Sequence, residues 1–108
     1  MRPRDPYANP IDYEIQQEKA ATLGRMSDKL QAVLAALADT ERALARTPGD
    51  NVLGERRGRL LEEAAEWVWY LVVQREAIGL TSHDALFETY RVPTLVRRRM
   101  GPRRRRGS

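Results

Sequence analysis

Seven consecutive apolar or aromatic residues, Trp67–Val73, constrain the fold of this chain more than any other stretch. Polar residues precede and follow this run in a pattern typical of a helix, from Glu62 to Glu66 and from Gln74 to Glu76. An amphipathic helix buries only three or four of every seven positions, so seven apolar residues in a row point in all directions around it. We therefore expect a central helix that is covered on several sides, by the rest of the chain and by a second copy of it.

Composition excludes several classes of protein. A chain of 108 residues forms one domain with room for three or four helices. It has no cysteine and one histidine, His83, so it has no disulfide framework, thiol nucleophile, Cys-ligated zinc or His-rich metal site. Residues 1–6 lack the apolar core of a signal peptide, and no apolar run approaches the roughly 18–20 residues that span a bilayer. We expect a cytoplasmic protein without a cofactor or a membrane partner.

Basic charge is concentrated near the C-terminus. The net charge is +4, but seven C-terminal arginines leave 12 basic and 15 acidic residues elsewhere, a net −3. The seven are Arg97, Arg98, Arg99, Arg103, Arg104, Arg105 and Arg106. Guanidinium groups pair bidentately with phosphate, which predicts a tail that contacts polyanions such as nucleic acid. No aromatic residue is interleaved, so such binding would not depend on base stacking. The alternative is compositional, because arginine outnumbers lysine 17 to 2 throughout the chain, as in GC-rich coding sequences.

The first long helix is predicted from Pro10 to about Ala45. Asn9 is a suitable N-cap, Pro10 suits the first helical position, and Asp12 lies near the positive end of the helix dipole. Apolar residues recur at steps of three and four, interrupted by Thr40, and they are Leu23, Met26, Leu30, Val33, Leu37 and Leu44. The stripe loses register before Gly24, so we expect the first turns to bend or to project past the core.

A turn at residues 47–51 separates this helix from a second one, predicted to run to about Ile78 with Gly79 as its C-terminal cap. Asp50 or Asn51 can cap its start. One seam of this helix contains Leu53, Leu60, Ala64, Trp67, Leu71 and Ile78, and Leu61, Val68 and Val72 widen it. Trp69, Tyr70 and Val73 lie off the seam. We expect these three residues at a second interface, where they are covered either by the two short C-terminal helices or by the second protomer of a symmetric homodimer, and the dimer is favoured because short helices cover little surface.

Two short helices complete the predicted fold. The first opens with Thr81 or Ser82 as its cap and ends before Pro93, and the second covers about Thr94 to Met100. Residues 1–9 form an extended lead-in, and residues 102–108 form a disordered basic tail. The prediction is a single all-α domain at residues 10–101, an antiparallel hairpin of long helices closed by two short C-terminal ones.

Three stretches also resemble a known family. The first is Asp12-Tyr13-Glu14 with Glu18-Lys19-Ala20 and Leu23-Gly24-Arg25. The second is Trp67-Val68-Trp69 followed by Val73-Gln74-Arg75-Glu76 and Gly79-Leu80, and the third is Tyr90-Arg91-Val92-Pro93. Over residues 11–101 the chain resembles a family of short bacterial helical proteins, a domain of unknown function. The resemblance implies a compact α-helical fold and no particular activity.

An enzymatic alternative depends on Glu62, Glu63 and Glu66. Their spacing is similar to the metal-binding helix of the all-α nucleoside triphosphate pyrophosphohydrolases, which hold Mg²⁺ with carboxylates from two helices. The Glu-x-x-Asp of a following helix is missing here, so Glu14 and Glu18 would have to replace it. The other interpretation is a solvated helix face, and His83 is expected to be an exposed residue of a helix's first turn. The leading hypothesis is a non-enzymatic interaction module.

Overall fold

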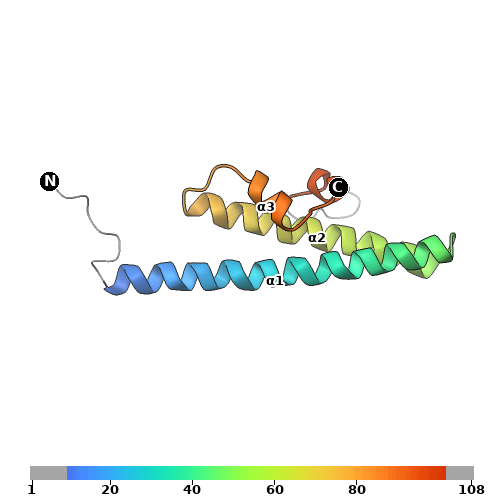
Figure 1. Ribbon diagram of the computed structural model, residues 1–108, viewed down its shortest axis with the longest axis horizontal. Coiled ribbons are helices and arrows are strands. Elements are labelled where there is room, and N and C mark those ends of the chain that lie inside the picture. The colour runs from blue at the N-terminus through green and yellow to red at the C-terminus, as the bar shows by residue number, and fades with distance from the viewer. Residues whose placement is uncertain (1–9, 102–108) are drawn as a thin grey trace, which may run out of the picture.

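Four helices make up the part of the chain that the computed structural model describes, residues 10–101. They are α1 (Pro10–Arg46), α2 (Asn51–Ala77), α3 (Asp84–Thr89) and α4 (Thr94–Arg98), and these residues contain no strand. The long helices α1 and α2 form an antiparallel hairpin, and α3 and α4 lie over it (Figure 1). The all-α hairpin predicted from the sequence is therefore confirmed. The expected lead-in and basic tail lie outside the described residues.

Local capping explains where α2 begins and ends. The backbone N–H of Leu53 donates a hydrogen bond to Oδ1 of Asp50 at 3.0 Å, so Asp50 is the N-cap. At the other end Gly79 adopts φ of 92°, a left-handed conformation that glycine reaches without steric cost. The N–H groups of Gly79 and Leu80 donate to the carbonyls of Glu76 and Arg75. This is a Schellman motif, and it turns the chain back over the hairpin.

The core lies between the facing stripes of α1 and α2 and under the C-terminal helices. Leu30, Val68 and Val96 are completely buried, and they come from α1, α2 and α4. The buried set contains Leu30, Val33, Leu37, Leu61, Ala64, Ala65, Val68, Leu71, Val72, Leu86, Val92 and Val96. Trp67 is half-buried against this set, as its place in the seam predicts, but Ile78 is 38% exposed. The seam thus ends before Ile78, since α2 ends at Ala77 and the chain turns away there.

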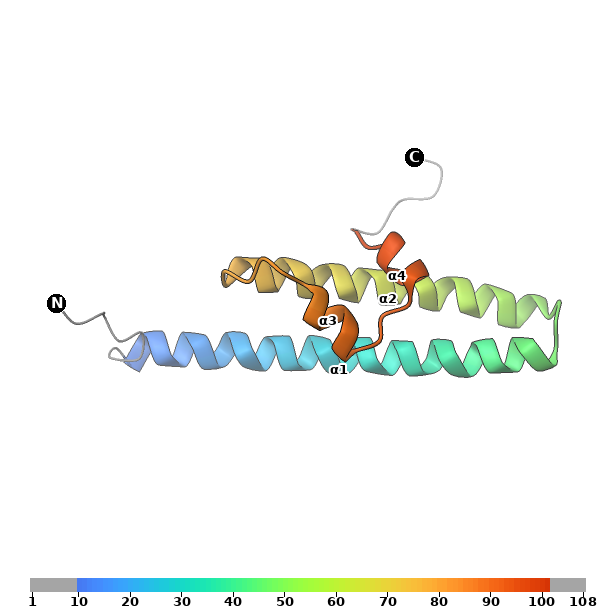
Figure 2. The same cartoon turned by 45° about the horizontal axis from the view of Figure 1, so that its top comes forward.

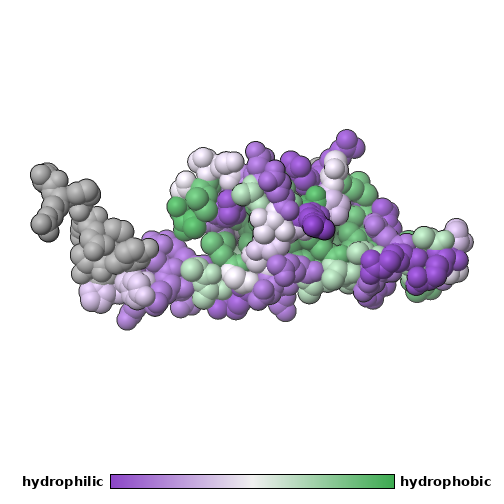
Figure 3. Space-filling model, in the orientation of Figure 1, coloured by the Kyte–Doolittle hydropathy of each residue, from purple (hydrophilic) through white to green (hydrophobic). Residues whose placement is uncertain are grey.

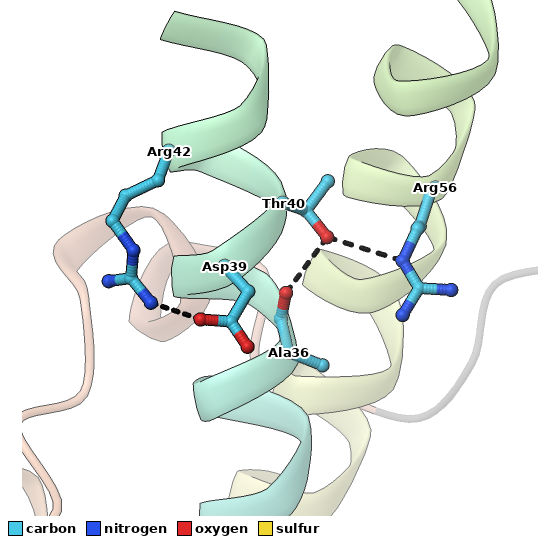
Figure 4. A network of polar contacts seen from close by, with 5 residues as sticks. All are labelled: Ala36, Asp39, Thr40, Arg42 and Arg56. Atoms are coloured by element: carbon cyan, nitrogen blue, oxygen red, sulfur yellow. Dashed lines mark hydrogen bonds and ion pairs between the residues drawn. The ribbon is translucent and has the colours of Figure 1, made fainter. Parts of the chain in front are cut away.

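Thr40 is a polar residue in the apolar seam of α1, and only 4% of it is exposed. Its hydroxyl donates to the carbonyl of Ala36 at 2.8 Å and accepts from Nε of Arg56 at 3.3 Å (Figure 4). The neighbouring pair on α1, Asp39 and Arg42, forms an ion pair away from α2. Because Arg56 is on α2, the Thr40 hydroxyl links the two long helices. The interruption of the stripe is therefore a satisfied polar contact that helps to set the hairpin's register.

The short helices differ in detail from the prediction. The cap position of α3 is His83, without a side-chain cap bond, in place of Thr81 or Ser82. Helix α3 ends at Thr89, and Arg91 takes φ of 49° so that the chain can reverse before Pro93. Helix α4 ends at Arg98, two residues earlier than expected. Both helices are too short to persist alone, so their order depends on burying Leu86 and Val96.

Helix α1 is ten residues longer than α2, with 37 residues against 27. Its N-terminal end extends past α2, and no other described helix lies beside it in either view (Figures 1 and 2). Residues 10–21 of α1, called the arm below, are all exposed. The first turns of α1 therefore project past the core, one of the two outcomes that the sequence predicted.

Candidate interaction surfaces

The residues predicted for a second interface share one face of α2. Val73 follows Trp69 by four residues and Tyr70 by three, so the three side chains are neighbours on the helix surface. Tyr70 is 41% exposed and Val73 is 38% exposed, and Trp69 is half-buried. We call Trp69, Tyr70 and Val73 the outer patch. Helix α2 is thus covered by α1 and α4 but not on this face.

Tyr70 is held in place at the edge of the outer patch. Its hydroxyl donates a hydrogen bond to Oε1 of Glu66 at 3.0 Å, one turn earlier on α2. Its ring meets that of Trp67 edge-on, with centroids 6.0 Å apart and planes at 71°. The hydrogen bond to Glu66 and the negative charge of that carboxylate raise the pKa of Tyr70 above its ordinary value. Tyr70 therefore stays a neutral donor, presenting an ordered aromatic surface to solvent.

Exposed apolar side chains are unevenly distributed over the described residues. Between residues 10 and 101, eight large hydrophobic residues are exposed, and of these only Val52 lies beside the turn that joins α1 to α2. The other seven lie toward the open end of the hairpin, and they are Ile11, Tyr13, Ile15, Tyr70, Val73, Ile78 and Leu80. Figure 3 shows hydrophobic surface where α2 ends and the chain turns toward α3. Clustering of this kind marks an interaction surface more than scattered apolar residues do.

The basic residues of α4 face solvent. Arg97, Arg98 and Arg99 are all exposed, and none of the ion pairs found within residues 10–101 includes them. The guanidinium of Arg97 stacks over the ring of Phe87 at 4.3 Å from its centroid, which fixes its position beside α3. The four remaining arginines of the predicted polyanion contact, Arg103–Arg106, lie outside the described residues. Two cations on α4 and a third at its C-cap therefore precede them.

The carboxylates of the enzymatic alternative do not form a centre. Glu62 and Glu63 are exposed, Glu66 accepts the bond from Tyr70, and Glu14 and Glu18 are in the arm. No group of three or more Asp, Glu, His or Cys side chains between residues 10 and 101 is placed to hold a metal ion. Nothing in this part of the chain supports the pyrophosphohydrolase interpretation.

His83 is not the exposed residue that its position suggested. Its side chain is only 13% exposed, and its Nδ1 accepts from Nε of Arg75 at 3.3 Å. Its Nε2 lies 3.2 Å from Oε1 of Glu76, while Arg75 also donates to the carbonyl of Ser82 at 3.1 Å. Arg75 and Glu76 at the end of α2 thus hold Ser82 and His83 at the start of α3, and we call these four residues the clamp. The signal for this contact is the Arg75-Glu76 pair in the last turn of α2, just before the Gly79 turn that leads to His83.

A shallow cleft of 180 Å³ lies between α1, α2 and α3, beside the same clamp. Leu23, Leu71, Leu86 and Tyr90 provide most of its apolar lining, and Arg75 and Ser27 are at its polar edge. Its volume is below the roughly 300 Å³ at which small-molecule sites begin. It is better described as an imperfect seam between helices than as a ligand pocket.

The fold and its surfaces define a small all-α protein with an open apolar end and a basic C-terminal helix. No helix among the described residues combines the length and the hydropathy needed to cross a membrane. The model of a family of unknown function, DUF6665, matches residues 1–105, and the chain belongs to this family. The expected relationship to a domain of unknown function is therefore confirmed. No curated protein and no solved structure shows significant similarity to the chain.

Proposed function

We propose that this protein is a non-enzymatic interaction module that forms a homodimer through the outer patch of α2. The observation that carries the proposal is the exposure of Tyr70 and Val73, beside Trp69, in an apolar run of which Val68, Leu71 and Val72 are buried. Aromatic residues are enriched where protein interfaces are fully buried. A second protomer would cover the face of α2 that α1 and α4 leave open. In this proposal residues 10–101 act as one domain in the bacterial cytoplasm.

Charge around the outer patch favours a second copy as the occupant. Glu62, Glu63 and Glu66 lie on α2 directly before the patch, whereas α4, which packs on α2, carries Arg97 and Arg98 and is followed by Arg99. A two-fold axis brings the same surface of both protomers together, so a patch that has both signs of charge can complement itself. Acidic α2 residues of one protomer could then face basic α4 residues of the other, which would select this pairing over others.

Replacing Val73 by glutamate should weaken self-association. A carboxylate placed in the centre of an apolar contact would be desolvated without a partner, and we expect a loss of about 2 kcal/mol, or roughly 30-fold in the dissociation constant. Sedimentation velocity over a range of micromolar concentrations measures this. The matched control is Val52→Glu, the same substitution at a residue that is 73% exposed on the same helix but far from the patch. A parent protein that is monomeric throughout, or an equal loss in both variants, would contradict the proposed dimer.

A second surface supports contact with nucleic acid. Arg98 and Arg99 are exposed without ion-pair partners in the described part of the chain, and Arg97 is held beside them by Phe87. Arg103–Arg106 follow within a few residues in the sequence. A run of this kind binds phosphates through charge and releases condensed counterions. We propose that the basic end of the protein rests on a nucleic-acid backbone without reading its sequence.

The salt dependence of duplex DNA binding tests this contact. Each phosphate neutralised contributes about 0.9 to the slope of log K against log salt concentration, so Arg98→Gln with Arg99→Gln should reduce the slope by about 1.8. The matched control, Arg46→Gln with Arg59→Gln, removes the same charge from exposed positions elsewhere. Fluorescence anisotropy with a labelled oligonucleotide gives both slopes. The proposed contact is wrong if the slope falls by the same amount in both double variants. It is also wrong if the parent protein does not bind the oligonucleotide at low salt.

A further inference from the structure

The arm of α1 begins where α2 stops. The 3.3 Å contact between Thr40 and Arg56 and the 3.2 Å contact between Glu41 and Arg57 fix which residues of the two helices are level. Counting back along the antiparallel pair from these contacts places Ala77, the last residue of α2, level with about residue 20 of α1. The residues of the arm before this level, 10–19, span about 15 Å and lie beyond the hairpin. They include Ile15, which is 46% exposed.

The arm continues the face that α1 turns toward α2. Five turns of α-helix contain 18 residues, so residues 18 apart point in the same direction. Leu30, Val33 and Leu37 have at most 7% of their surface exposed. Asp12, Ile15 and Lys19 precede these three buried residues by 18 positions each. The core-facing side of α1 therefore continues into the arm as an acid, an isoleucine and a base.

The charges of these three side chains complement those of a second arm that runs in the opposite direction. A second arm that runs antiparallel, with the two Ile15 side chains at the centre, places Asp12 of each copy opposite Lys19 of the other. A parallel second arm would instead oppose Asp12 to Asp12 and Lys19 to Lys19, which is unfavourable. Charge complementarity thus identifies a second copy of this chain, in one orientation, as the occupant.

We propose that the arms of two copies pair antiparallel, each arm taking the place that a longer α2 would have occupied. Because an arm in that position ends where α2 ends, its first turn meets Ile78 and Leu80, which are 38% and 41% exposed. One two-fold operation then covers Ile15 of the arm together with the exposed apolar residues at the end of α2. This contact uses no residue of the outer patch and does not depend on the dimer proposed above. Two different two-fold contacts on one chain would build assemblies larger than a dimer.

Single cysteines test the pairing directly, because the natural chain has none. In the full-length chain, Ile15→Cys should form an intermolecular disulfide on mild oxidation on the order of tenfold faster than Glu14→Cys, since paired arms raise the effective concentration of the thiol at the axis. Asp12→Cys alone should not form this disulfide, because antiparallel arms that pair Asp12 with Lys19 separate the two copies of residue 12 by about 10 Å along the helix axis, beyond disulfide range. A mixture of Asp12→Cys and Lys19→Cys chains should cross-link heterologously, as read by mass spectrometry.

Two results would overturn the arm pairing. One is a rate for Ile15→Cys no greater than that for Glu14→Cys, which means that the arms do not meet. The other is equally fast cross-linking of Asp12→Cys alone, which means that they meet in parallel. Repeating the experiment in chains that also carry Val73→Glu separates the two contacts. Cross-linking that persists in that background supports the arm contact whatever becomes of the outer patch, and an outer-patch dimer survives the failure of the arms.

Discussion

Replacing Leu30 by alanine is expected to lower the free energy of unfolding by about 3 kcal/mol. Leu30 is completely buried between the long helices, and it is one of the largest fully buried side chains in residues 10–101. Its removal loses apolar burial and leaves a cavity that two long, well-packed helices cannot close. A small domain has only about 5–15 kcal/mol of stability in total, so this loss is a large fraction of it.

Urea denaturation followed by circular dichroism, at matched protein concentration, measures the effect of Leu30→Ala. Leu80→Ala is the control, since that leucine is 41% exposed and its truncation should cost at most about 0.5 kcal/mol in the monomer. Equal costs for the two substitutions would mean that the centre of the hairpin is not the close-packed core described above.

Placing an aspartate at Val96 is expected to release the C-terminal helices from the hairpin. Val96 is completely buried, and α4 has only five residues, so packing and not helix propensity keeps it ordered. An unpaired buried carboxylate costs about 3 kcal/mol or more, which exceeds what one short helix gains by docking. We expect local detachment of α4, with the helical content of α1 and α2 largely retained.

Limited trypsin digestion detects this detachment, because Arg97, Arg98 and Arg99 are cleavage sites that become extended when α4 unfolds. Cleavage there should accelerate by about 100-fold, the equivalent of roughly 3 kcal/mol of local stability. Thr94→Asp, an exposed substitution in the first turn of the same helix, is the control and should leave the rate unchanged. Unaltered cleavage in Val96→Asp would show that α4 is not held by this side chain.

Much of the architecture followed from local patterns. Gly79 was predicted as the C-terminal cap of α2, and Asp50 or Asn51 as its N-cap, from the chemistry of single residues; Gly79 and Asp50 act as the caps. The stripe from Leu23 to Leu44 predicted which side of α1 meets α2, because apolar spacing of three and four residues has one geometrical solution on a helix. The cap of α3 was predicted wrongly. Ser82 had the better intrinsic preference, but Arg75 and Glu76 hold His83 where the helix starts.

The surfaces were harder to predict than the core. The apolar run at residues 67–73 indicated that α2 is covered on several sides, but not which of its residues stay open within one protomer. Exposure depends on where α3 and α4 dock, and contacts between helices far apart in sequence decide that. The metal-site interpretation of Glu62, Glu63 and Glu66 has no support for the same reason. Three glutamates on one helix become a metal site only if another helix brings ligands to them, and none does so within residues 10–101.

The sequence by itself determined the four helices, the caps of α2 and the seam between the long pair, since each of these depends on residues within a few turns of one another. Only the tertiary structure decided that Trp69, Tyr70 and Val73 share an uncovered face, that Ile78 is left at the open end, and that His83 is clamped by the end of α2. The physical reason is that a side chain is buried only when another surface packs against it. A side chain's own chemistry states its preference for water or for the interior, and the placement of its neighbours determines the outcome.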